Sequence, residues 1–140
     1  MKIYICGSLT FSKEMIEIGE KLKELGHKVQ IPTDAKLITK GKHNHNDLDA
    51  DFKHCLENDI MRTHMKFAQK CEAILCLNYD KNNIHGYIGA ATLMELGIAY
   101  LNRRKMFLWQ KLPNFNDQRW AHEVRTMQPI VIDGDLTKIK

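Results

Sequence analysis

The sequence predicts an α/β protein in which a five-stranded parallel sheet lies between two layers of helices. Short apolar runs alternate with amphipathic segments along the chain, and the run AILCL at 73–77 is apolar at every position. A strand that is apolar on both faces is typical of a parallel sheet covered by helices on both sides. Five strands joined by right-handed crossovers favour the flavodoxin-like three-layer sandwich, with strand order 2-1-3-4-5.

The first part of the chain predicts a strand, a helix and a second strand. KIYIC at 2–6 is dense in β-branched and aromatic residues, which is typical of a buried strand. A helix is expected over 12–25, with Ser12 as its N-terminal cap and Gly26 as its C-terminal stop. HKVQIP at 27–32 predicts the second strand, because its proline cannot donate a ladder hydrogen bond and ends the strand.

The later elements follow the same alternation. Residues 33–50 are polar and have no clear period, so they predict a loop, and the spacing of apolar residues over 48–69 predicts one long amphipathic helix. The further expected elements are the strand at 73–77, a helix over 86–101, a strand at 106–109, a loop and helix within 114–127, and a strand at 129–132.

Composition and charge narrow the class of function. The 140 residues predict one domain over 1–140, with 44% hydrophobic and 27% charged residues. No apolar run approaches the ~20 residues of a membrane span, and the opening MKIYICGS does not match a signal peptide, so we expect a cytoplasmic protein. The net charge of +4, without a run of five like charges, favours a small anionic ligand over a nucleic acid polymer.

One acid, Glu95, interrupts the most apolar helix of the chain. Residues 86–101, GYIGAATLMELGIAYL, are apolar almost all round the predicted helix apart from this side chain. An ionised carboxylate does not stay in such surroundings unless it is paired, hydrogen-bonded or neutralised. Glu95 therefore either faces a cleft or has a private structural partner, and the sequence leaves both alternatives open.

Two loops are candidates for a ligand site. In open parallel sheets, ligands bind beyond the carboxyl ends of the strands where the strand order reverses, here between the first and third strands. The loops that follow these strands are CGSLTFS at 6–12, with Gly7 and Ser8, and NYDKNNIHGYIG at 78–89. Glycines and small polar residues let an anion approach free amides at a helix N-terminus, but tight turns need glycine without any ligand as well.

Further candidates surround these two loops. The second loop offers Tyr79, Asp80, Gly86 and Gly89 as substrate contacts, although these residue types are ordinary in loops. Asp59, on the helix that enters the third strand, would form another wall of the crevice. Alternatively, Asp59 has no functional role and only contacts solvent beside the apolar stripe of that helix.

Histidines and acids gather in one polar segment. His43 and His45 form an H-x-H pair, with Asp47, Asp49 and His54 nearby. No second ligand pair at zinc-site spacing and no adjacent cysteine accompanies them. We therefore expect histidines of a flexible loop, able to contact an anionic substrate, and neither a metal site nor a cofactor.

Three blocks of the chain resemble the nucleoside 2-deoxyribosyltransferase superfamily. They are the strand and turn IYICGSLTF, the Asn-Asp pair in LENDIMRTHMKFAQKCEAILCLNYD, and the segment GAATLMELGIAYLNRRKMFLW with its E-x-G-x-A element. Over nearly all its residues the chain is also similar to a group of small nucleoside 2-deoxyribosyltransferase-like proteins. LNYDKNNIHGYIGAATLMELGIAY and the ending MQPIVIDGDL carry this second resemblance.

The resemblance implies the flavodoxin-like fold and a chemistry. That chemistry is cleavage of the N-glycosidic bond of a nucleoside or nucleoside 5′-monophosphate, by hydrolysis or deoxyribosyl transfer. The family's nucleophilic glutamate falls on Glu95, its base-assisting aspartate on Asp59, and its sugar- or phosphate-binding turn on Gly7 and Ser8. Relatives have an acid or a serine six residues before the glutamate, where this chain has Gly89.

Other functions stay open at this point. A non-catalytic nucleotide-binding or sensor module would use the same crevice, and Gly89 favours it, as does Lys13 as the only basic residue directly after the first strand. A third alternative is an interaction protein whose histidine-rich loop is ordered by a partner. Because the related enzymes close each site with a neighbouring chain, we also expect a homodimer or higher homo-oligomer, with Trp109, Phe115 and Trp120 as interface candidates.

Overall fold

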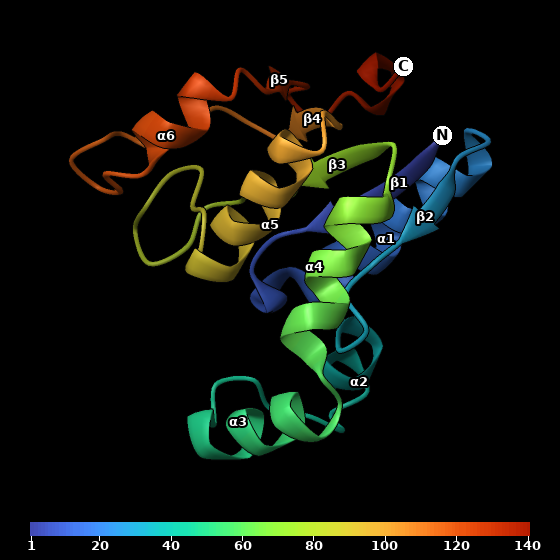
Figure 1. Ribbon diagram of the computed structural model, residues 1–140, viewed down its shortest axis with the longest axis vertical. Coiled ribbons are helices and arrows are strands. Elements are labelled where there is room, and N and C mark those ends of the chain that lie inside the picture. The colour runs from blue at the N-terminus through green and yellow to red at the C-terminus, as the bar shows by residue number, and fades with distance from the viewer.

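The computed structural model describes residues 1–140 and confirms the predicted sheet (Figure 1). All strands pair in parallel, in the order β2-β1-β3-β4-β5. The strands are β1 (Lys2–Cys6), β2 (Lys28–Gln30), β3 (Ala73–Cys76), β4 (Lys105–Leu108) and β5 (Ile130–Val131). The order reverses between β1 and β3, where Ile5 pairs with Leu75, so the predicted ligand-binding edge exists in the fold.

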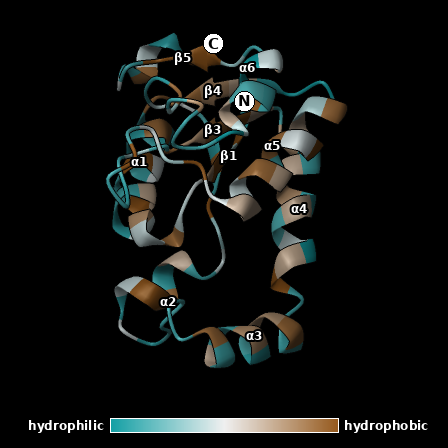
Figure 2. Cartoon of the chain, turned by 90° about the vertical axis from the view of Figure 1, so that its left-hand side faces the viewer, coloured by the Kyte–Doolittle hydropathy of each residue, from teal (hydrophilic) through white to brown (hydrophobic).

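Helices cover both faces of this sheet. In Figure 2, α1 (Ser12–Glu24) lies on one side of the strands, and α4 (Ile60–Lys70) and α5 (Ala90–Leu101) lie on the other. The remaining elements are α2 (Ala35–Thr39), α3 (Leu48–Glu57), α6 (Ala121–Thr126) and the 3-10 turns Leu9–Phe11 and Leu136–Lys138. None of the helices is long and apolar enough to span a bilayer.

Alternation along β1 divides the apolar residues between two cores. Ile3 and Ile5 pack toward α1, where they meet Met15 among other residues, whereas Tyr4 and Cys6 pack toward α4 and α5. Successive side chains of a strand point to opposite faces, which produces this division. As a result, the Tyr4 hydroxyl reaches the helix layer that contains α5.

The predicted long helix over 48–69 is broken in two. Helix α3 ends at Glu57, and Asp59 has a left-handed backbone with φ of 47°. The break is stable locally because the Asn58 side chain donates to the His54 carbonyl, and Asn and Asp tolerate this conformation better than most residues. Helix α3 therefore turns away from the sheet at the far end of α4 (Figure 1).

Helix α3 contributes no buried residue to the fold. Its apolar side chains Leu48, Phe52 and Leu56 are all exposed, Phe52 to 66%. Apolar packing therefore does not explain where this helix lies.

Two smaller differences concern the N-terminal half. The segment 33–50 is not wholly a loop, because it contains α2, whose Ala35 is fully buried in the core beside α1. Ser12 is not the cap of α1 but its first residue, and its hydroxyl donates to the Leu9 carbonyl. Ser8 caps instead the 3-10 turn that precedes α1.

The aromatic residues expected at an interface make contacts within the chain. Trp109 packs against Tyr79 with ring centroids 5.5 Å apart, and Trp120 donates its indole N–H to the Ile88 carbonyl. The Arg125 guanidinium lies 4.6 Å from the ring centroid of Phe115. These intrachain contacts account for the three side chains, and homo-oligomerisation stays a prediction.

Replacing Gly86 tests the tight approach of the loop after β3 to the segment after β4. Gly86 has φ of +72°, and a Cβ there would overlap the Lys111 carbonyl. Gly86→Ala should therefore lower the free energy of unfolding by about 2 kcal/mol or more. Gly97→Ala is the matched control, because its Cβ meets nothing within 4 Å and should stabilise α5 by up to ~1 kcal/mol. Urea denaturation measures both, and equal effects of the two changes would contradict this account.

Candidate active site

Glu95 is buried in the interior of α5 and has a structural partner. Its side chain lies on the face of α5 that packs against the sheet, and the residue is only 7% exposed. The Tyr4 hydroxyl on β1 donates to Glu95 Oε1 over 3.0 Å. The group that holds the carboxyl is therefore a neutral phenol on the neighbouring strand and not a lysine or arginine.

The environment of Glu95 raises its pKa to near neutral pH. Burial raises the pKa of Glu95 from 4.5 to about 7, and the hydrogen bond from Tyr4 acts in the opposite direction. Burial, and then the charge of Glu95, raises the pKa of Tyr4 well above its ordinary value, so Tyr4 stays a hydrogen-bond donor. Near pH 7, Glu95 populates both its ionised and its protonated form.

A histidine that the sequence did not single out faces the same carboxyl. His64 of α4 places Nδ1 4.0 Å from Glu95 Oε1. Its other nitrogen, Nε2, accepts from the Thr33 backbone N–H over 3.2 Å and lies 3.0 Å from the Thr33 hydroxyl. Because Nε2 is an acceptor, the neutral ring carries its proton on Nδ1, toward Glu95. Burial lowers the pKa of His64, which favours this neutral form.

A cleft of about 220 Å³ opens at the N-terminus of α5. Its lining comes from the turn after β1, from the N-terminal turn of α5, and from the segment around α3. The lining residues are Gly7, Ser8, Leu9, His45, Asp51, Tyr87, Gly89, Ala90, Ala91 and Thr92. The cleft therefore lies at the carboxyl end of β1, where the topology predicts a ligand site.

Glu95 does not line this cleft, but it follows two residues that do by one turn of α5. Ala91 and Thr92, which do, precede it by four and three residues on the same helix face. Helical side chains lean toward the N-terminus, so the Glu95 carboxyl leans toward these two residues. Glu95 Oε2 accepts no hydrogen bond from the protein, yet it is not among the polar atoms sealed from solvent. One carboxyl oxygen is thus held, and the other is free.

The turn side of the cleft is suited to an anion. Lys81 Nζ lies 2.8 Å from Ser8 Oγ, and it sits 5.2 Å from the centroid of the Tyr87 ring. Gly89 caps α5 without a side-chain hydrogen bond, so the first amides of this helix are available. At Gly7, with φ of +147°, a Cβ would lie 2.9 Å from the Leu77 carbonyl oxygen, so glycine is required for the approach.

The remaining predicted residues lie outside the cleft. Asp59 is 64% exposed at its side chain, and its carboxylate lies 3.2 Å from Arg62 Nε, so the structure does not bring it to Glu95. Tyr79 packs between Phe11 and Trp109, away from the Glu95 carboxyl.

Asp80 and Gly86 build the loop after β3. Asp80 accepts from the Gly86 backbone N–H over 3.1 Å and from the Gln110 amide over 2.7 Å. Neither residue lines the cleft. Of the eight predicted site residues, Gly7, Ser8 and Gly89 line the cleft, and Glu95 lies one helical turn from it.

Sequence reasoning missed Tyr4, His64 and Lys81. For His64 a signal exists: it falls four residues after Ile60 and four before Ala68, on the buried face of α4. A histidine in an apolar stripe needs a polar partner in the core. For Tyr4, the sequence shows an aromatic strand residue with no sign of its partner.

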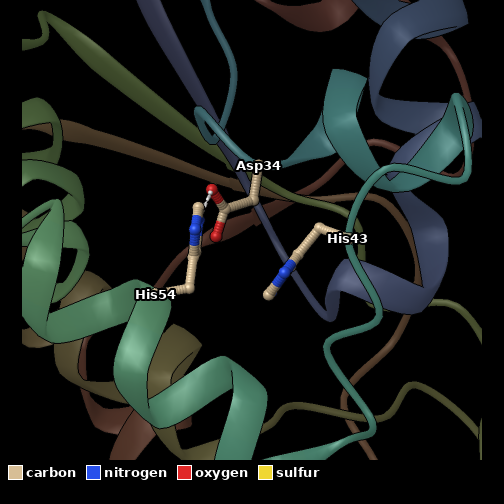
Figure 3. A group of neighbouring side chains, drawn as sticks. All are labelled: Asp34, His43 and His54. Carbon is tan, nitrogen blue, oxygen red and sulfur yellow. Dashed lines mark hydrogen bonds and ion pairs between the residues drawn. The ribbon is translucent and has the colours of Figure 1, made fainter.

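The histidine-rich segment is not arranged as expected. The sequence predicts no ligand geometry for His43 and His54, but their rings lie 4.2 Å apart by centroid, with His54 on α3. Asp34 joins them, and one potential ligand atom from each residue lies within 4.8 Å of the others (Figure 3). These three residues are the group in the chain that could hold a metal ion.

Fold and site together define a class: a flavodoxin-like α/β protein with a buried carboxyl below a cleft at the switch point of the sheet. No protein-family model matches the sequence, and neither does any curated protein. Among solved structures, the CMP N-glycosidase BcmB of Clostridium botulinum is similar, with a TM-score of 0.51 and 14% sequence identity. The match covers 99% of this chain and 98% of that one, and at this identity it shows a common fold.

The pH dependence of stability tests the environment of Glu95. Its pKa in the folded protein, about 7, lies above the ordinary value of 4.5, so the folded state holds this proton more tightly than the unfolded chain does. The resulting stabilisation is present at low pH and is lost as the pH rises through about 7. Compared with Glu95→Gln, the wild type should lose about 3 kcal/mol of unfolding free energy across this range.

Urea denaturation at a series of pH values measures this difference. Tyr4→Phe removes the hydrogen bond that lowers the pKa of Glu95, so the loss should extend to higher pH in that variant. Parallel pH curves for the wild type and Glu95→Gln would show that the carboxyl is not buried as described.

Proposed function

We propose that this chain cleaves the N-glycosidic bond of a nucleoside 5′-monophosphate, with Glu95 as the nucleophile. The observation that carries the proposal is the Glu95 carboxyl, held on one oxygen by Tyr4, free on the other, and one helical turn from the cleft at the N-terminus of α5. The common fold with a CMP N-glycosidase, together with the E-x-G-x-A element, supports it.

The proposed chemistry uses the free oxygen of Glu95. As the base departs, the anomeric carbon gains oxocarbenium character, and a nearby carboxylate stabilises this positive charge and forms a covalent glycosyl intermediate. Tyr4 fixes the orientation of the carboxyl through Oε1 and leaves Oε2 for the sugar. Water then releases the sugar phosphate, or a second base accepts the sugar.

The 5′-phosphate is assigned to the turn side of the cleft. Lys81 supplies a positive charge there, next to Ser8 and the amides at the N-terminus of α5. Both a cation and a helix N-terminus stabilise a phosphate group. This arrangement supports a phosphorylated substrate over a free nucleoside.

The leaving base is assigned to the outer wall of the cleft. Asp51 and His45 line that wall, whereas Asp59 is turned toward Arg62 in solvent. We therefore assign the contact with the base to Asp51 in place of Asp59.

A nucleotide-binding module without turnover is the second candidate function. Gly89 lines the cleft but offers no side chain to the sugar, which is the specific observation in its favour. Such a module would bind nucleoside monophosphates and release no base.

The catalytic assignment is tested by base release from a panel of ribo- and deoxyribonucleoside monophosphates. Glu95→Gln should lower kcat by about 10³-fold or more, because it removes the nucleophile. Glu123→Gln, an acid in the first turn of α6, is the matched control and should keep wild-type rates. For the wild type, kcat/KM should rise with pH through about 7 as Glu95 ionises. Binding by calorimetry without base release would instead support the second candidate.

Lys81→Met tests the phosphate assignment. Loss of this cation should raise KM for monophosphates about 10-fold or more and change KM for free nucleosides little. Lys13→Met is the control, because Lys13 lies on the surface of α1, 3.9 Å from Glu17. If both substrate types weaken equally in Lys81→Met, the lysine does not bind the phosphate.

A further inference from the structure

We propose that Asp34, His43 and His54 bind one divalent transition-metal ion of the zinc type. The three residues come from different segments: the junction between β2 and α2, the loop before α3, and α3 itself. Figure 3 shows their side chains converging, and one potential ligand atom from each lies within 4.8 Å of the others. This site is separate from Glu95 and does not depend on the proposed glycosidase activity.

The carboxylate of Asp34 points to a missing ligand. The residue is 1% exposed, and its Oδ1 accepts from His54 Nε2 over 2.8 Å. Its other oxygen, Oδ2, is sealed from solvent and has no hydrogen-bond partner. A buried carboxylate oxygen without a partner costs several kcal/mol or is neutralised, and a bound cation removes this cost.

His43 already has the supporting contact of a metal ligand, and His54 already directs one nitrogen toward Asp34. Asp51 Oδ1 lies 2.7 Å from His43 Nε2, so this nitrogen donates to the carboxylate and Nδ1 keeps its lone pair for an ion. The Asn58 amide lies 3.3 Å from His54 Nδ1, which leaves His54 Nε2 as the nitrogen that faces Asp34. On binding an ion through Nε2, His54 shifts its proton from Nε2 to Nδ1, so that the ring coordinates as a neutral imidazole.

The donor set selects the kind of ion. Two imidazoles with one carboxylate suit zinc and its neighbours, whereas Mg²⁺ and Ca²⁺ prefer oxygen ligands alone. Metal–ligand bonds of about 2.0–2.2 Å place tetrahedral ligands ~3.4 Å apart, so the side chains need to close by only about an ångström. A surface cavity of about 240 Å³ is lined by Asp34 and His54 and offers an approach for the ion.

Such an ion would hold α3 in place, because this helix has no buried apolar residue to do so. Helix α3 buries no residue, and its side-chain hydrogen bonds to other elements run through His43 and Asp34. An ion bound to all three ligands joins α3 and the preceding loop to the β2–α2 junction. Because Asp51 and His45 line the cleft, it would also order the outer wall of the candidate active site.

Calorimetry with Zn²⁺ on chelator-treated protein tests this site. We expect one ion per chain, a rise in Tm, and protection of residues 40–57 from limited proteolysis. Asp34→Asn and His54→Gln should each weaken Zn²⁺ binding about 100-fold or more, and Asp51→Asn about 10- to 100-fold. His122→Gln is the matched control, since that histidine on α6 faces Arg125, and it should bind as the wild type does.

Cobalt substitution tests the same site in the wild-type protein. Co²⁺ in the wild-type protein should give the intense visible absorption of a four- or five-coordinate site, and this absorption should disappear when Zn²⁺ is added. A weak octahedral spectrum, unchanged binding in Asp34→Asn, or an equal loss in His122→Gln would overturn the proposal. If Asp34→Asn does not fold, the wild-type spectrum and the loss of Zn²⁺ binding expected in His43→Gln test the same site.

Discussion

The buried carboxyl group of Glu95 connects the sheet with the helix layer formed by α4 and α5. Glu95 lies on α5 between the sheet and α4, and a carboxyl in such surroundings must be hydrogen-bonded or neutralised. Tyr4 from β1 satisfies one oxygen, and His64 from α4 faces the same atom. Glu95 thus adds a polar contact to the apolar packing of α5 against β1 and α4. The other oxygen accepts no hydrogen bond from the protein, and the proposed function assigns it to the sugar.

Two consecutive residues connect this buried carboxyl with the cluster beside α3. Thr33 donates to His64, and Asp34 accepts from His54. The junction between β2 and α2 is thus hydrogen-bonded to α4 through His64 and to α3 through His54. Burial lowers the pKa of His64, and the charge of Asp34 opposes this shift, so an ion that neutralised Asp34 would lower the pKa further and keep His64 neutral.

Most of the fold follows from local patterns, which is why it could be predicted. The run AILCL forms the fully buried β3, and right-handed crossovers leave few alternatives to the observed order. The break between α3 and α4 could not be predicted in the same way, because Phe52, Leu56 and Ile60 keep a helical spacing across it. The backbone of Asp59 ends the helix there without interrupting the apolar pattern.

From the sequence alone it follows that a carboxyl occupies an apolar helix and that glycine-rich turns end the first and third strands. Only the tertiary structure decided which polar groups meet. It brought Tyr4 and His64 to Glu95 and left Asp59 in solvent. It also placed Asp34 beside His43 and His54. The physical reason is that apolar periodicity reports which face of an element is buried. It does not report which polar group on another element lies opposite, and hydrogen bonds and metal ligation depend on that direction.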